Sequence, residues 1–156
     1  MCGIIAIIRR RSSRRPPDPA QLLACLAEAV AQPPRPRDPD LAVRLQTIAD
    51  QLASVDHELR GVAGIQTILA DRTVSPAVAE AVDRLDTMVR AIEAHLEADL
   101  AEADGLEAIN ASLVAVKDAA WSLDRDRLRA AREVLELSGP DVPASAVGPF
   151  FSIQQA

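Results

Sequence analysis

The chain has 156 residues, 49% of them apolar, which is enough for one packed domain and excludes wholesale disorder. Its net charge of −6 argues against a general nucleic-acid-binding protein, whose surface would be basic. Aromatic residues make up only 2%, so the core must be built from Leu, Val, Ile and Ala, a composition that favours helices.

The first apolar run, residues 2–8, is rich in β-branched side chains and has the length of a buried strand. It is far too short to span a membrane, and the basic residues follow it instead of preceding it as they would in a secretory signal. Residues 9–17, a basic stretch that ends in prolines, are expected to form a solvated loop, with contact to a phosphate group as the alternative. With only two cysteines there is no disulfide framework, so we expect a cytoplasmic protein without a membrane span.

Helices are predicted from residue 18 onward. Asp18 followed by Pro19 is typical of a helix start, and the apolar spacing continues to about residue 31. A proline-rich linker at 33–39 precedes a second amphipathic helix over about 40–59. Gly61 and Gly64 interrupt this helix, and residues 62–71 are predicted to form a short helix with inward-facing Ile65, Ile68 and Leu69.

Two longer apolar seams follow. Ser75 and Pro76 are predicted to begin a helix whose seam runs from Val78 to Leu96 with alternating spacings of four and three. A second seam of the same kind begins at Leu106, and its helix should continue to about residue 137. Two such seams joined by a short turn predict an antiparallel helical hairpin, against which the earlier helices pack.

The second residue, Cys2, is the strongest candidate for chemistry. Removal of Met1 would leave a chain that begins with a thiol and a free α-amine on one residue. The thiol has an ordinary pKa of about 8.5 and the amine one of about 7.7–8.0, so the amine can accept the thiol proton near neutral pH. Gly3, which lacks a Cβ atom, would let a substrate approach the nucleophile's backbone closely.

The sequence Met1-Cys2-Gly3-Ile4-Ile5 with its apolar continuation resembles the start of class II, N-terminal-nucleophile glutamine amidotransferases. The resemblance is strongest to the glutaminase domain of the glucosamine-6-phosphate synthase type. It implies that Cys2 attacks the glutamine amide with its α-amine as general base, and that Gly3 contacts the substrate. It also implies ammonia transfer to a sugar phosphate (fructose 6-phosphate to glucosamine 6-phosphate), with L-glutamine as the other substrate and no metal or cofactor.

The expected organisation has three parts. Residues 1–17 would be the first strand and loop of an α+β N-terminal-nucleophile sandwich, 18–139 a helical insertion, and 140–156 a return into the glutaminase domain. Ser152-Ile153-Gln154-Gln155-Ala156 resembles the helix that leads into the family's Arg-Gly-x-Asp-Ser glutamine-binding segment. That segment is not in this sequence, so we expect no glutaminase activity from this chain alone and place the missing residues in a continuation or a partner chain.

The remaining polar, cysteine and tryptophan residues have ordinary structural interpretations. Cys25 is expected to be an inert core thiol, His57 and His95 to be surface or boundary residues, and Trp121 to pack at the edge of the core, with a docking anchor as the alternative. The carboxylates, Asp56 among them, and the run from Asp124 to Arg127 are expected to be solvated helix-surface charges.

A second function stays open on the sequence alone. The helical segment would then be a non-enzymatic module for oligomerisation or docking. Under either interpretation we expect a homo-oligomer or a partner chain, no nucleic acid and no membrane.

Overall fold

The computed structural model describes residues 14–98 and 105–138, and within these ranges the chain forms helices only. The expected fold class is therefore wrong: the described residues contain no strand or sheet, whereas we predicted an α+β sandwich with an N-terminal strand. The residues assigned to that strand, 2–8, lie outside the described ranges. The predicted helical character of the long middle segment is confirmed.

The first two helices have nearly the predicted bounds. Helix α1 spans Pro19–Ala31, and the Asp18 side chain accepts a hydrogen bond of 3.0 Å from the backbone N–H of Ala20, which satisfies one of the free donors at the helix start. Helix α2 spans Leu41–Glu58. The linker between them is held by an ion pair of Asp38 with Arg44.

Helix α3, Gly61–Ala70, follows α2 after a sharp turn. Gly61 has a φ of 70°, a conformation that side-chain-bearing residues rarely adopt. Gly64 lies so close to the end of α2 that an added Cβ atom would be 2.0 Å from the carbonyl oxygen of Leu59. Ile65 and Ile68 are buried as predicted, and Leu69 is half-buried against the core.

Helix α4, Val74–Ala98, begins slightly earlier than predicted. The carbonyl of Thr73 accepts the N–H of Ala77, and the Asp71 carboxylate accepts the N–H of Thr73, so the turn before Val74 starts the helix. Ser75, predicted to be the cap, lies inside the first turn. The rest of the apolar seam points into the core as expected.

The last helical rod has three parts in series. Helix α5 spans Leu106–Trp121, a π-helical stretch η1 spans Ser122–Leu128, and helix α6 spans Arg129–Ser138. The predicted continuation to about residue 137 is confirmed, but the π-helix was not predicted. It inserts an extra residue per turn, so that Leu123 and Leu128, five residues apart, are both fully buried.

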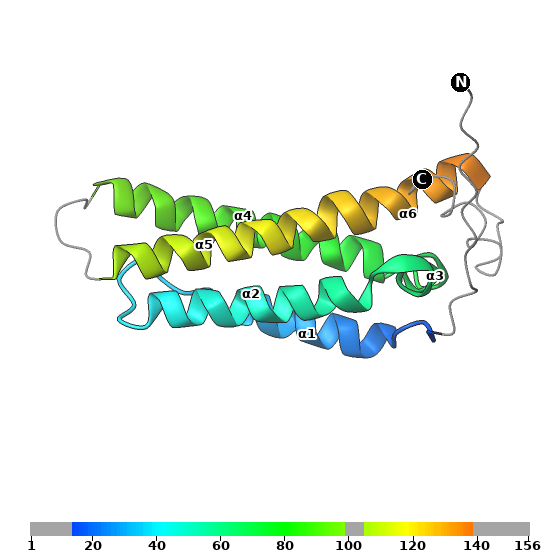
Figure 1. The fold of residues 1–156 in the computed structure, drawn as a ribbon, viewed down its shortest axis with the longest axis horizontal. Helices are drawn as coiled ribbons and strands as arrows, with labels where there is room; N and C mark the ends of the chain where they lie inside the picture. Colours follow the sequence, from blue (N-terminus) through cyan, green and yellow to red (C-terminus); the bar gives the residue numbers. More distant parts are fainter. Residues whose placement is uncertain (1–13, 99–104, 139–156) are drawn as a thin grey trace, which may run out of the picture.

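Helices α1, α2 and α4 and the rod formed by α5, η1 and α6 lie side by side in a bundle, with α3 across one end (Figure 1). Helix α1 packs on α2 and α4, and α5 also packs on α2 and α4, so α2 and α4 lie diagonally across the bundle. Helices α4 and α5 run in opposite directions, as the predicted hairpin requires, but the most extensive contact of α5 is with the parallel α2. The core contains the fully buried Leu45, Leu52, Leu59, Val74, Val78, Val116, Leu123 and Leu128.

None of the helices in the described part of the chain is both long and apolar enough to cross a membrane.

Candidate functional site

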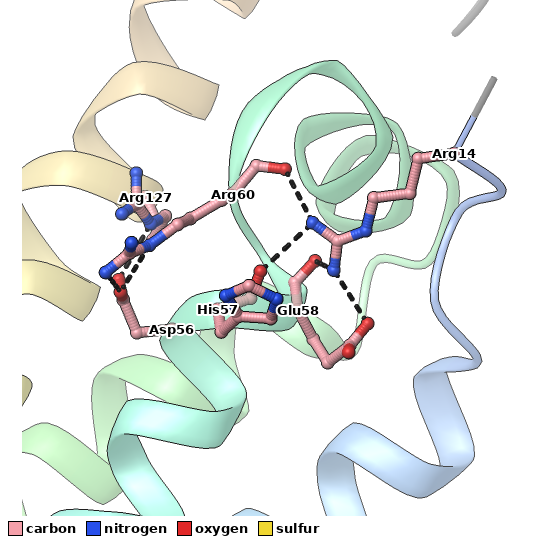
Figure 2. Close-up of polar contacts among 6 residues, drawn as sticks. All are labelled: Arg14, Asp56, His57, Glu58, Arg60 and Arg127. Atoms are coloured by element: carbon pink, nitrogen blue, oxygen red, sulfur yellow. Dashed lines mark hydrogen bonds and ion pairs between the residues drawn. The ribbon is translucent and has the colours of Figure 1, made fainter. Parts of the chain in front are cut away.

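The two residues to which the sequence assigns chemistry, Cys2 and Gly3, lie outside the described residues. The structure does describe the segment that leads from them into the bundle, beginning at Arg14. This segment meets a group of charged side chains at the end of α2 (Figure 2). The geometry of that group decides which of its members are available for chemistry.

Arg14 binds the C-terminal end of α2. Its Nη1 donates to the carbonyl oxygens of His57 at 3.1 Å and Arg60 at 3.4 Å. Its Nη2 donates to the carbonyl oxygen of Glu58 at 3.1 Å and to the Glu58 carboxylate at 2.8 Å. The last carbonyls of a helix have no partner within it and carry partial negative charge, so a guanidinium there stabilises the helix end. Arg14 lies in a loop, as expected, but its guanidinium is held against the end of α2 and is only partly exposed to solvent.

Asp56, on the last turns of α2, is buried between two arginines. Its Oδ1 accepts a hydrogen bond of 2.8 Å from Nε of Arg127, and its Oδ2 accepts from Arg60 at 2.7 and 3.0 Å. The Asp56 side chain is only 4% exposed and that of Arg127 13%, whereas Arg60 reaches into solvent. Asp56 and Arg127 were both expected to be surface charges, and this expectation is wrong.

The charge on Asp56 is stabilised by its neighbours. Burial alone raises the pKa of this carboxyl, but hydrogen bonds from Arg127 and Arg60 and their positive charges outweigh burial, so the pKa lies below its ordinary value. A general base needs a pKa near the working pH, and this carboxylate is instead held ionised with both oxygens occupied. The cluster therefore fits a structural ion pair that fastens η1 to α2.

Cys25 is less buried than the core thiol that the sequence predicts, but its environment is that of an inert structural thiol. It is half-buried on α1, and its Sγ donates to the carbonyl oxygen of Gln51 at 3.8 Å. Burial and the negative charge of Glu28 raise the pKa of this thiol. Because only the thiolate is nucleophilic, Cys25 is a poor nucleophile at neutral pH.

The two histidines occupy surface or boundary positions, as predicted, and do not form a pair. His57 is exposed near the end of α2, and half-buried His95 on α4 accepts a hydrogen bond of 3.3 Å from Arg37. Among the residues that the structure describes, no three His, Cys, Asp or Glu side chains are placed to hold a metal ion. No protein-family model, curated protein or solved structure matches this chain.

A groove of about 1010 Å³ lies between the C-terminal end of α1, the proline-rich linker and α4. Leu85, Met88 and Ile92 of α4 contribute apolar surface, and Arg44 and Arg84 lie at its margin. Both arginines already pair with carboxylates, Asp38 and Glu80. Arg35 also lines the groove, which therefore combines apolar surface with guanidinium groups.

Trp121 has a different environment from the one predicted. It is 59% exposed at the end of α5 and does not pack at the edge of the core. The alternative that the sequence left open for it, an anchor for a partner, is the one that its position permits.

Proposed function

We propose that this chain contains the opening of a class II glutamine amidotransferase, with Cys2 as the nucleophile and its α-amine as the general base. The observation that supports the proposal is the sequence Met1-Cys2-Gly3-Ile4-Ile5, which places a thiol and a potential free amine on one residue. The proposed site of action is the cytoplasm, where thiols stay reduced. The proposed ammonia acceptor is a sugar phosphate, bound by domains outside this sequence.

The shape of the bundle is compatible with an insertion between two segments of such a domain. The start of the bundle contacts α3, because the hydroxyl of Thr67 donates to the carbonyl of Pro17 at 3.1 Å. The last helix also contacts α3, because Val134 of α6 and Ile65 form one buried cluster. Both ends therefore meet at the same end of the bundle (Figure 1), as an inserted module requires.

In this proposal the bundle has a structural task and Cys2 a chemical one. Attack by the thiolate on the glutamine side-chain amide would form a γ-glutamyl thioester, and the protonated amine would return its proton to the departing ammonia. The family's Arg-Gly-x-Asp-Ser segment is needed to bind glutamine, so the chemistry requires a polypeptide that supplies it.

The proposal is tested in an enzyme that contains both this chain and such a segment. Intact-mass measurement should show that Met1 has been removed. After treatment with a glutamine-analogue electrophile, the mass should rise by that of one analogue molecule, attached to Cys2. Cys2→Ala should abolish the labelling, whereas the matched variant Cys25→Ala should leave it unchanged. Retention of Met1, or equal labelling of the Cys2→Ala variant, would overturn the proposal.

A non-enzymatic helical module is the second candidate. The observation that favours it is Trp121, whose large aromatic side chain is 59% exposed at the end of α5. Efficient labelling of Cys2 by the glutamine analogue would show that the chain is more than a non-enzymatic helical module.

A further inference from the structure

We draw no further inference here: the strongest candidate, the groove between the C-terminal end of α1, the proline-rich linker and α4, carries nothing because the three arginines that line it are matched by three carboxylates, and nothing in the described part of the chain shows what covers it.

Discussion

Asp56 depends on its arginine partners more than any other described carboxylate, because it is almost fully buried. Removing one member of a buried ion pair leaves the other charge without compensation. We expect Asp56→Asn to lower the free energy of unfolding by about 3 kcal/mol, since Arg127 would stay buried without a counter-charge. Urea unfolding at pH 7 measures this.

The matched control is Asp50→Asn on the same helix. Asp50 is exposed and accepts a hydrogen bond from Gln46, which an asparagine can still accept. This variant should stay within about 0.5 kcal/mol of the parent protein. Equal losses in both variants would show that the Asp56 pair is no more important than a surface charge.

The same pair predicts a pH dependence. The folded-state pKa of Asp56 is lowered, so its stabilising contribution is complete above the unfolded aspartate pKa of about 3.9 and is lost as the pH falls through the lower folded pKa. The stability difference between the parent protein and Asp56→Asn should therefore be largest near pH 7 and shrink at acid pH. A difference that is constant from pH 7 to pH 3 would contradict this.

At the scale of elements, the packing of η1 explains why Arg127 is buried although its sequence neighbourhood predicts a surface charge. The starts and spacings of α1 and α2 were predictable because capping and apolar periodicity are local properties of the sequence. The contact of Arg127 with Asp56 joins residues 71 positions apart and depends on how η1 packs on α2. The gap of five between Leu123 and Leu128 is the sequence signal that could have revealed the irregular turn.

The π-helix also predicts where the last rod tolerates a deletion. Deleting Asp126, an exposed residue within η1, would change the spacing of the two buried leucines from five to four, which suits an ordinary α-helix. We expect this variant to stay folded with helical circular dichroism close to that of the parent protein. Its urea midpoint should fall only modestly.

The control deletion removes Asp118, an exposed residue within regular α5. It would rotate every later core residue by about 100° relative to Leu113 and Val116. The apolar side chains before and after the deletion could then not all face the core. This variant should lose cooperative unfolding. Similar stabilities for the two deletions would mean that η1 has no special tolerance.

For the whole molecule, the sequence predicts a helical segment but not that its two ends both contact α3. Gly64 at the α2–α3 turn and the shared cluster of Ile65 and Val134 bring both ends to α3, and neither feature has a local pattern that distinguishes it from an ordinary break or core contact. The chemistry assigned to Cys2 has the opposite character. It follows from a few adjacent residues, lies outside the described ranges and stays a prediction.

The bundle should fold by itself, because the buried core of the described residues comes from helices that contact one another. We expect a polypeptide of residues 14–138 to unfold in one cooperative transition, within about 0.5 kcal/mol of the 156-residue chain. A polypeptide of residues 20–138 lacks Arg14 and the Asp18 cap, so it should be less stable by about 2 kcal/mol.

These two polypeptides separate a self-contained module from one that needs the residues around it. If the 14–138 polypeptide unfolds cooperatively and the 20–138 polypeptide is less stable, the polar contacts at the start of α1 and at the end of α2 belong to the self-contained folding unit. Such a unit can be placed in a loop of another domain at little cost, because its two ends leave from the same side. A non-cooperative 14–138 polypeptide would instead show that residues outside the bundle contribute to its core, and the three-part organisation proposed for the chain would then be wrong.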